Sequence, residues 1–541
     1  MTKINFKYYD GNDLYNDGII EEKLLSAYKD GVKSFSDDSD LFFYTTNIRQ
    51  NIINWYPFKP KSKILEIGAG VGPITGALLN TGNQVTSVEG SKRRASVIYE
   101  RYKNYDNLTI NCGNFNEMKF GEKFDYIVLI GVFEYARMFS SDKNAFNKFF
   151  ENVIKNLKED GVILIAIENK LGLKYLNGMS EDHFKKPYVG IEDYSYSNKF
   201  ETFSRTELRN FVEEYGYKAK FYGAFPDYKL PSFIFSENYK PSVMDYKKFT
   251  SFNYYDDETN FDASKAIKSF IKGDLTIDVS NSFLVEISKT SKFADVNYVT
   301  FQNYRNKKYL TGTCVGNEIF KFPVFEESLP HLLDLKETHD LLNAKGIPAC
   351  MIEQNKDNSF IIQKLEGNTV LSIIDDYIND NDIDSAMVEL DNVINYIKSI
   401  STLKEIKEPY VKDIKKIYGK QCYMLPISLF DLNLNNIIKD KNKYTLIDME
   451  WSSKKQIPID YNIFIIIQLL CDNIPSINDY FSKKELFDRY NISEDKIDLF
   501  FKINDEFFNN EKDWLNIYLN KLFIEKNSGT KILDYKQKLD N

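Results

Sequence analysis

The most constraining feature of this chain is a set of alternating glycines directly after an apolar segment. Segment 63–67 predicts a buried β-strand, and glycines follow it at every second position, as Gly68, Gly70 and Gly72. Glycine lets a chain turn sharply after a strand and lets a ligand lie against bare backbone. A dinucleotide-binding fingerprint needs its third glycine three residues after the second, where this chain has Pro73. The spacing therefore predicts a ligand-binding turn that does not take a dinucleotide.

Glu66 precedes these glycines, so the pattern acidic-x-Gly-x-Gly-x-Gly resembles motif I of the class I S-adenosylmethionine (SAM) methyltransferases. Segment 84–89 predicts a second strand, and its last residue, Glu89, is a carboxylate suited to hold a ribose diol. Asn114 and Phe115 lie where this family places a polar and an apolar residue around the adenine. The resemblance implies SAM as the cofactor, bound by the following residues: Glu66, Gly68, Gly70, Gly72, Glu89, Asn114 and Phe115.

Further apolar segments indicate an α/β fold for this part of the chain. Segments 124–131 and 162–167 predict a third and a fourth buried strand, and helical patterns lie between the strands. This alternation is typical of a parallel sheet with crossover helices. We therefore expect a Rossmann-like class I methyltransferase domain. The alternative is a doubly wound domain whose glycines serve only packing.

Length, charge and apolar content narrow the class of protein. The 541 residues are too many for one core, so two or three domains are expected. The formal net charge of −9 argues against nucleic acid as a partner, because no basic excess exists to neutralise phosphates. The N-terminal residues lack the apolar core of a signal peptide, and we expect no transmembrane segment. The 5 cysteines are scattered without metal-type spacing, which favours reduced core residues in a cytoplasmic protein.

A group of sequence blocks resembles methyltransferases of bacterial surface-polysaccharide and O-antigen pathways. These blocks are residues 130–136, 166–175, 180–183, 202–205 and 225–231. The resemblance extends from about residue 14 to residue 287, so we expect the methyltransferase domain to occupy residues 1–292. It implies a glycan or sugar-phosphate substrate and other enzymes of glycan biosynthesis as partners.

The chemistry of the acceptor decides which side chains this domain needs. A hydroxyl acceptor benefits from a general base, whereas a phosphomonoester is already anionic and needs cations. Candidate bases are Glu134, Glu168 and His183, and candidate anion-binding residues are Lys170, Lys174 and Arg205. We select Glu134 and His183 as the catalytic candidates, His183 because two acidic residues precede it in a predicted loop. Each of these residues could instead be a surface charge or a structural hydrogen-bonding group.

A second dense block lies at residues 428–451. Asp431 precedes Asn436, and a short strand, a polar turn and a second strand ending at Asp448 follow. Folded as a hairpin, this segment brings Asn436 and Asp448 together at its open end. An amide and a carboxylate there suit Mg²⁺, and Asp431 would be close enough to accept a hydroxyl proton.

This block resembles the catalytic loop and metal-binding aspartate of protein-kinase-like folds. The sequence Asp-Met-Glu at 448–450 makes it more similar to small-molecule phosphotransferases, such as the aminoglycoside phosphotransferases, than to protein kinases. The resemblance implies an α+β kinase-like domain at residues 293–541 that binds ATP and Mg²⁺. It assigns Asp431 as the catalytic base, Asn436 and Asp448 as metal ligands, and Lys321 with its ion-pair partner Glu337 as nucleotide-binding residues.

The domain order resembles the bifunctional O-antigen chain-terminating methyltransferase–kinase family, whose kinase phosphorylates a terminal sugar hydroxyl and whose methyltransferase caps the phosphate. We therefore expect a transferase that modifies a surface glycan or its precursor in these two steps. The alternative is a sugar O-methyltransferase whose kinase-like domain is inactive and binds glycan or a partner. Leu429 in place of the family's histidine, and the lack of a Gly-rich loop at 302–320, favour this alternative. The set Asp431, Asn436 and Asp448 favours the two-step reading.

Overall fold

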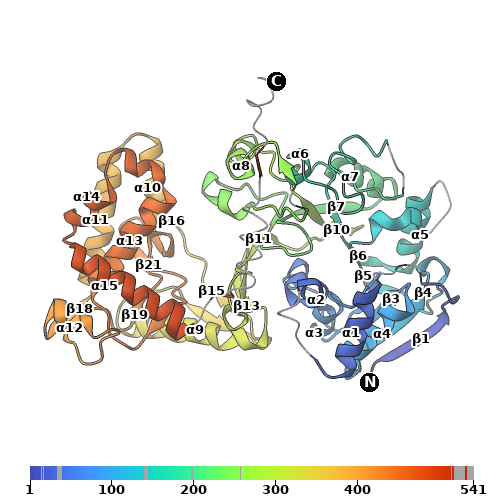
Figure 1. The fold of residues 1–541 in the computed structure, drawn as a ribbon, viewed down its shortest axis with the longest axis horizontal. Helices are drawn as coiled ribbons and strands as arrows, with labels where there is room; N and C mark the ends of the chain where they lie inside the picture. The colour runs from blue at the N-terminus through green and yellow to red at the C-terminus, as the bar shows by residue number, and fades with distance from the viewer. Residues whose placement is uncertain are drawn as a thin grey trace. The chain divides into compact units, whose positions relative to one another are not determined.

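The computed structural model of the chain describes residues 1–13, 15, 18–32, 39–138, 144–195, 199–255, 257–512, 515–516 and 531–532. Unit 1 contains Met1–Tyr304 and Cys314–Asn317, and unit 2 contains Arg305–Thr313 and Glu318–Asn516. They form the blue-to-green and the yellow-to-red parts of Figure 1. The sequence predicted a boundary after residue 292, which lies shortly before residues 304–318, where the chain passes from unit 1 to unit 2. None of the helices in the described part of the chain has the length and apolar character needed to cross a bilayer.

The strands of unit 1 are β1 (Lys3–Tyr8), β2 (Lys63–Ile67), β3 (Gln84–Glu89), β4 (Leu108–Gly113), β5 (Phe124–Ile130), β6 (Leu157–Glu168), β7 (Lys218–Phe225), β8 (Phe233–Ser236), β9 (Glu258–Thr259), β10 (Ser282–Ser288), β11 (Val296–Phe301) and β23 (Lys531–Ile532). Neighbouring strands follow the order β1-β4-β3-β2-β5-β6-β10-β7-β8-β11. Strands β1 to β6 pair in parallel, and β10 lies antiparallel between β6 and β7. The predicted mixed α/β fold with a mainly parallel sheet is thereby confirmed.

Helices separate the strands of unit 1 and cover the sheet. They are α1 (Ile19–Lys29), α2 (Ser39–Thr45), α3 (Thr75–Asn80), α4 (Lys92–Tyr102), α5 (Ala145–Asn156), α6 (Leu173–Leu176), α7 (Arg205–Glu214) and α8 (Ala263–Lys272), with short 3₁₀ helices η1 (Asn47–Ile52), η2 (Phe115–Glu117), η3 (Phe133–Met138) and η4 (Val243–Lys248). Strand β5 is almost wholly buried, as expected of a parallel strand covered on both faces, which explains its continuous apolar sequence.

The strand order reverses direction between β2 and β5. Strands β3 and β4 lie on one side of β2, whereas β5 and β6 lie on the other. Because all of these strands run parallel, their carboxyl ends meet at one edge of the sheet. Open α/β sheets bind ligands in the crevice at such a switch point. The segments that follow β2, β3, β4 and β5 are therefore expected to line a binding site.

Unit 2 begins with the strands β13 (Ile319–Pro323), β14 (Ile352–Gln354) and β15 (Phe360–Ile362), which pair in the antiparallel order β13-β15-β14. Strand β12 (Thr311–Gly316) carries residues of both units. Helix α9 (Leu329–Ala344) packs its apolar face, including Leu332 and Leu335, against Ile352 and Phe360. The 3₁₀ helices of this part are η5 (Lys307–Tyr309) and η6 (Glu326–Ser328).

The rest of unit 2 is mainly helical. Its helices are α10 (Val370–Asn379), α11 (Ile383–Ser399), α12 (Asp413–Tyr418), α13 (Ile459–Asn473), α14 (Lys483–Arg489) and α15 (Glu494–Asp505), with the shorter turns η7 (Leu434–Asn436), η8 (Pro475–Asp479) and η9 (Glu506–Lys512). Its short strands are β16 (Asn368–Thr369), β17 (Thr402–Glu405), β18 (Gln421–Met424), β19 (Ser428–Leu429), β20 (Ile437–Asp440), β21 (Lys443–Leu446) and β22 (Ser452–Ser453). Strands β20 and β21 form the hairpin expected from the sequence, with Ile437 opposite Leu446 and Asp440 opposite Lys443.

Candidate functional site

The carboxyl ends of the parallel strands of unit 1 enclose a first cavity of about 170 Å³. Its walls come from the segments after β2 to β5: Gly68, Glu89, Gly90, Asn114, Phe115, Gly131 and Val132. Four predicted cofactor residues thus lie together, namely Gly68, Glu89, Asn114 and Phe115. Tyr15, Arg94, Tyr135 and Phe149 also line this cavity; of these, only Tyr135 belongs to a block that the sequence analysis singled out, at 130–136.

The glycine turn brings bare backbone to this region. Gly68 and Gly70 have φ angles of +71° and +59°, in the left-handed region that favours glycine. A Cβ at Gly68 would lie 2.5 Å from Val132 Cγ2, whereas a Cβ at Gly70 would meet no atom within 4 Å. Gly72 is turned towards α4, because a Cβ there would lie 2.9 Å from Tyr102 Cε2. Gly72 therefore serves helix packing, while Gly70 faces open space.

Glu89 connects the glycine turn to the start of α4. Its Oε2 accepts a hydrogen bond from Gly70 N at 2.7 Å, and its Oε1 accepts one from Ser91 N at 2.9 Å. The side chain is only 4 % exposed. Burial raises its pKa, and nearby Arg94 acts in the opposite direction. A carboxylate has about four acceptor positions, so Glu89 retains capacity to bind ligand hydroxyl groups on the cavity side.

We expect Glu89→Ala to weaken SAM binding by about 1–3 kcal/mol, because a charge-assisted hydrogen bond to the ribose would be lost. Isothermal titration calorimetry with SAM measures this change. Glu117→Ala, at an exposed position of η2, is the matched control and should bind SAM as the unmodified protein does. If Glu89→Ala bound SAM with unchanged affinity, Glu89 would not contact the cofactor and would only hold the glycine turn in place.

Glu66 lies beneath the turn and does not line the first cavity. Its Oε2 accepts hydrogen bonds from Thr75 Oγ1 at 2.7 Å and from Ser87 Oγ at 2.6 Å. Burial raises its pKa to about 7. Glu66 therefore ties β2 to α3 and β3, and it contributes only to the wall of a neighbouring cavity.

This second cavity, of about 200 Å³, shares walls with the first, including Gly68, Gly131 and Tyr135. Its remaining walls contain Gly70 and several cationic or tyrosine side chains: Tyr44, Arg49, Tyr228 and Lys229. Two of its cations contact carboxylates, since Arg94 lies 2.7 Å from Glu21 and Lys229 lies 3.1 Å from Glu168.

Arg49, from η1, differs from these two cations. Within the described residues its guanidinium has no carboxylate within ion-pair distance, and its buried Nε has no hydrogen-bond partner. The guanidinium lies 5.1 Å from the centre of the Phe43 ring. The second cavity therefore holds a buried arginine that forms no close ion pair with a carboxylate of the described residues, although Asp227 acts on its pKa from a greater distance.

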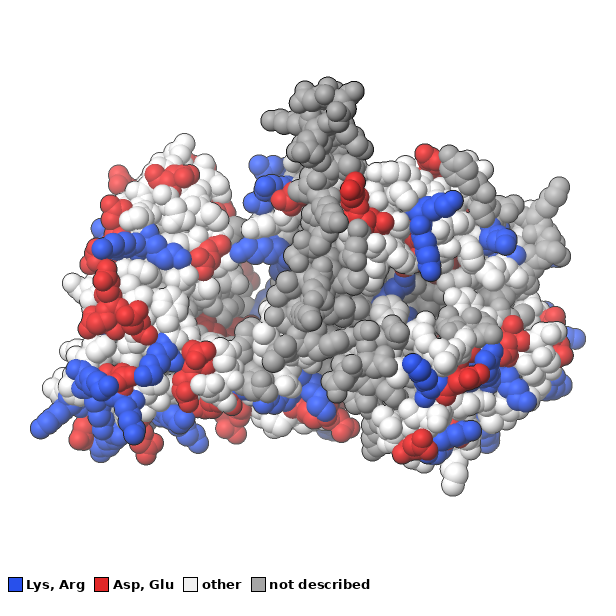
Figure 2. Space-filling view, viewed as in Figure 1, with Lys and Arg blue, Asp and Glu red and all other residues white. Residues whose placement is uncertain are grey.

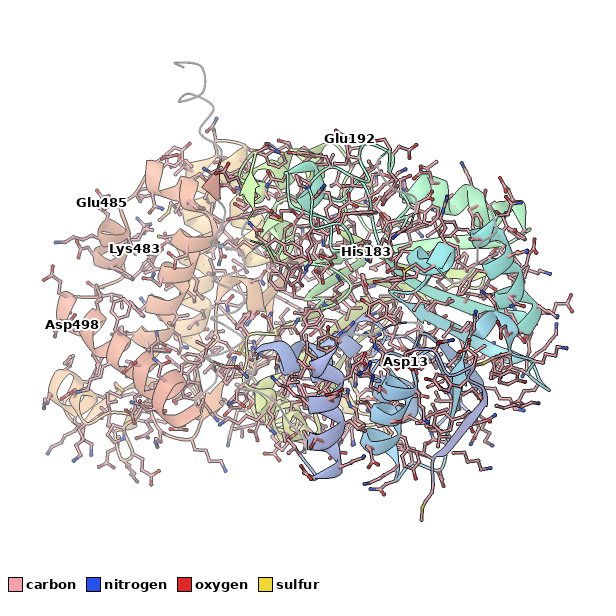
Figure 3. The ribbon with its side chains drawn as sticks, turned by 45° about the vertical axis from the view of Figure 1, so that its right-hand side comes forward. Asp13, His183, Glu192, Lys483, Glu485 and Asp498 are labelled. Carbon is pink, nitrogen blue, oxygen red and sulfur yellow. The ribbon has the colours of Figure 1, made fainter. Side chains whose placement is uncertain are left out.

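Neither predicted catalytic residue of unit 1 is among the described residues that line the two cavities. Glu134, on η3, is 1 % exposed, and neither of its carboxyl oxygens has a hydrogen-bond partner. Burial raises the pKa of Glu134 to about 8. His183, labelled in Figure 3, follows α6 and contacts Tyr135 Oη through Nδ1 at 3.3 Å. Because Tyr135 lines both cavities, His183 contacts a residue of the cavity walls.

The three candidate anion-binding residues contact carboxylates and line neither cavity in the described part of the chain. Each side chain therefore already has a structural partner. The ion pairs join Lys170 to Glu207 at 2.6 Å, Lys174 to Glu168 at 3.6 Å, and Arg205 to Asp278 at 2.8 Å. Glu168, the third candidate base, is held between Lys174 and Lys229, and these two cations outweigh burial and lower its pKa.

The buried carboxyl of Glu134 predicts a pH dependence of stability. An unfolded Glu titrates near 4.5, so between about pH 4.5 and about pH 8 the folded state holds a proton that the unfolded state has released. The contribution of Glu134 to the free energy of unfolding is therefore fully present below about pH 4.5 and is lost as the pH rises towards about 8. Glu134→Gln lacks the titration and should be more stable than the unmodified protein by roughly 2–4 kcal/mol at the alkaline end.

Thermal melts across this pH range, read by circular dichroism, measure the difference between the two proteins. Exposed Glu117→Gln is the control and should parallel the unmodified protein at every pH. A constant offset between Glu134→Gln and the unmodified protein would show that Glu134 is not protonated in the folded state.

The second group of candidate residues meets at the open end of the β20–β21 hairpin in unit 2. Asp431 Oδ2 accepts hydrogen bonds from Glu450 N at 2.7 Å and Trp451 N at 3.1 Å, while its buried Oδ1 has no partner. Asn436 Nδ2 donates to the Asp431 carbonyl at 3.0 Å, and Ile447 N donates to the Asn436 carbonyl at 2.9 Å. Burial raises the pKa of Asp431 well above its usual range, and Glu450 adds to this.

Lys321 on β13 is buried and forms ion pairs with Asp448 and Glu450. Burial alone would lower the pKa of Lys321, but the two carboxylates raise it. Glu450 also lies 2.6 Å from Arg305 Nη1. The structure does not bring Glu337 to Lys321, because Glu337 lies on the exposed face of α9. Glu450 takes the position that the sequence interpretation gave to Glu337.

The predicted metal ligands of unit 2 supply one amide, from Asn436, and one carboxylate, from Asp448. Within the described residues no group of 3 or more His, Cys, Asp or Glu side chains could hold a metal ion. Mg²⁺ is commonly held by one or two carboxylates together with substrate phosphates and water. The pair therefore fits Mg²⁺ only in company with a phosphate-bearing ligand.

Comparisons with known proteins concern unit 1. Residues 65–163 match the family model described as a methyltransferase domain, and this segment contains the glycine turn and strands β3 to β5. An uncharacterized methyltransferase of Staphylococcus carnosus is 26% identical over 150 residues, which are 28% of this chain and 66% of that protein. Ribosomal RNA small subunit methyltransferase A of Thermotoga petrophila is 31% identical over 91 residues, 17% of this chain and 35% of that protein.

The chain thus spans just under two thirds of the first of these relatives and about a third of the second. Among solved structures, the CcbJ methyltransferase from Streptomyces caelestis is 12% identical, with 51% of this chain and 99% of that chain covered and a TM-score of 0.30. The matched segment contains every described lining residue of the first cavity except Tyr15. Segment 65–163 of unit 1 therefore matches a methyltransferase domain.

Proposed function

We propose that this protein is a SAM-dependent methyltransferase that methylates a phosphate on a bacterial surface glycan or its precursor, and that unit 2 is a kinase-like domain that supplies this phosphate. One observation carries the proposal. The second cavity shares walls with the first, and it contains Arg49, which has no carboxylate partner in the described part of the chain. A phosphate beside the cofactor would balance this charge through bidentate hydrogen bonds.

The residues of unit 1 would then position two ligands. Bound SAM supplies an electrophilic methyl group on its sulfonium, so the protein mainly has to align an acceptor oxygen. Glu89 would accept hydrogen bonds from the ribose, and Phe115 would contact the adenine. Arg49 would hold the acceptor phosphate. A phosphomonoester needs no general base at neutral pH, which agrees with Glu134 keeping its proton up to about pH 8.

The residues of unit 2 would perform the preceding step. Asp431 would accept the proton of a sugar hydroxyl, Asn436 and Asp448 would hold Mg²⁺, and Lys321 would neutralise nucleotide phosphates. The unpartnered Oδ1 of Asp431 supports a role in which this oxygen accepts a proton from a ligand. The Lys321–Glu450 ion pair supports this role for Lys321, because a second carboxylate keeps the lysine charged and in place.

A second candidate function rests on the ion pair between Lys321 and Asp448. This lysine engages the carboxylate that Mg²⁺ would need, and Leu429 stands where the family has a histidine. These two features favour a sugar O-methyltransferase whose kinase-like unit is inactive and binds glycan or a partner protein.

Methyl transfer from labelled SAM to synthetic glycans with and without a terminal phosphate tests the proposal. We expect the phosphorylated glycan to be the better acceptor. Arg49→Gln should raise the KM for it by roughly tenfold or more, because a charged hydrogen bond contributes about 1.5–3 kcal/mol. Affinity for SAM should not change. Arg93→Gln, at a residue that pairs with Asp13 outside both cavities, is the control. Transfer to the plain glycan alone would refute a phosphate acceptor.

A further inference from the structure

Lysine side chains gather at one end of unit 2, over α12 and β18, at the lower left of Figure 2. Segment 402–424 contains 6 lysines and 3 acidic residues, a local excess of positive charge in a chain whose formal net charge is −9. We define the lysine patch by six exposed residues: Lys407, Lys412, Lys415, Lys416, Lys420 and Lys454. Lys454 is included because segment 454–456 lies beside segment 402–424: Gln456 N donates a hydrogen bond to the Glu408 carbonyl at 2.7 Å.

The acidic residues within this region compensate only part of the patch. Asp413 contacts two lysines, Lys416 and Lys502, so its one negative charge faces two positive charges. No carboxylate of the described residues lies within ion-pair distance of Lys412, Lys415 or Lys420. On α12 the buried residue is Ile414, whereas Lys415 and Lys416 of the helix and Lys412 just before it are exposed. Lys407 pairs with Glu405 at 3.8 Å, so the patch presents uncompensated ammonium groups at Lys412, Lys415 and Lys420.

Two exposed apolar side chains lie beside these lysines. Leu403 and Tyr423 are 49 % and 55 % exposed, and they are direct cross-strand partners in the β17–β18 pair. The same ladder continues to Lys420, whose carbonyl accepts a hydrogen bond from Ile406 N at 2.9 Å. An aliphatic and a tyrosine side chain next to lysines are typical of surfaces that sit at a membrane–water interface.

From this combination we propose that the lysine patch docks unit 2 onto an anionic membrane surface. The ammonium groups would face anionic headgroups, and Leu403 and Tyr423 would enter the boundary between headgroups and acyl chains. Leu403, the exposed aliphatic partner of Tyr423, favours a bilayer over nucleic acid. Single-stranded nucleic acids are instead bound by stacking on aromatic side chains beside basic grooves. Such docking is independent of which acceptor unit 1 methylates.

Vesicle co-sedimentation of the full chain tests this proposal. We expect binding to vesicles of phosphatidylglycerol and phosphatidylcholine in equal parts, no binding to phosphatidylcholine alone, and a loss of binding at high salt. Each lysine near an anionic surface contributes roughly fivefold in affinity. The variant with Lys412, Lys415, Lys416 and Lys420 changed to Gln should therefore lose roughly a hundredfold or more.

The control variant carries the same number of Lys→Gln changes at exposed positions of unit 2 outside the patch: Lys345, Lys356, Lys441 and Lys443. It should bind like the unmodified protein, and both variants should keep its circular dichroism spectrum. A Leu403→Ser, Tyr423→Ser double variant should lose the salt-resistant part of the binding. Equal loss in both lysine variants, or binding to heparin and DNA without binding to anionic vesicles, would overturn the proposal.

Discussion

Gly70→Asp is expected to abolish SAM binding while leaving unit 1 folded. Gly70 has a φ of +59°, which aspartate tolerates better than most residues, and a Cβ there would meet no atom within 4 Å. The new carboxylate would lie on the wall of the second cavity, next to the backbone N–H that donates to Glu89. Bulk and a second negative charge at this point should lower SAM affinity by roughly a hundredfold or more, measured by calorimetry.

Two controls separate the possible causes of this loss. Gly70→Asn has the same size and the same tolerance of positive φ but no charge, so the difference between the variants isolates electrostatics. Gly82→Asp makes the same change at a φ of +72°, where a Cβ also meets no atom, but in an exposed turn after α3. It should bind SAM normally. Full SAM affinity in Gly70→Asp, or binding of NADH in place of SAM by the unmodified protein, would refute the assignment.

The part of the site that could be predicted from sequence is the part built by consecutive residues. A strand, a turn and the following strand occupy fixed positions relative to each other in a parallel sheet, so Gly68 and Glu89 could be placed from their spacing alone. The β20–β21 hairpin follows the same logic, because pairing across a short turn determines where Asn436 and Asp448 lie. In both cases the prediction depends only on the geometry of neighbouring segments.

The rest of the site depends on contacts between distant segments, which a single sequence does not encode in its spacing. Arg49 belongs to a 3₁₀ helix before the glycine motif and reaches the second cavity only through tertiary packing. Glu337 was expected to pair with Lys321, but the helical phase of α9 directs it to solvent, and Glu450 fills that role. The ion pairs of a buried site depend on which side chains the folded chain brings together. The separation of two residues in the sequence does not predict this.

Asp431→Asn is expected to abolish phosphate transfer from ATP to the glycan while keeping unit 2 folded. An asparagine has nearly the same shape, and its carbonyl oxygen can still accept from the backbone of Glu450 and Trp451, as Asp431 Oδ2 does at 2.7 and 3.1 Å. The variant lacks the carboxylate that would take up the hydroxyl proton. Asp440→Asn, at the exposed turn of the same hairpin, is the control and should transfer phosphate normally.

This variant also decides between the two candidate functions, because the two steps reside in different units. If methylation follows phosphorylation, Asp431→Asn should fail to methylate the unphosphorylated glycan even with ATP present, yet should methylate a pre-phosphorylated glycan at the rate of the unmodified protein. The measurement is incorporation of labelled methyl into both acceptors, with and without ATP. ATP-independent methylation of the plain glycan at an unchanged rate would eliminate the two-step order and leave unit 2 as a binding module. Loss of methylation on both acceptors would show instead that unit 1 depends on an intact unit 2.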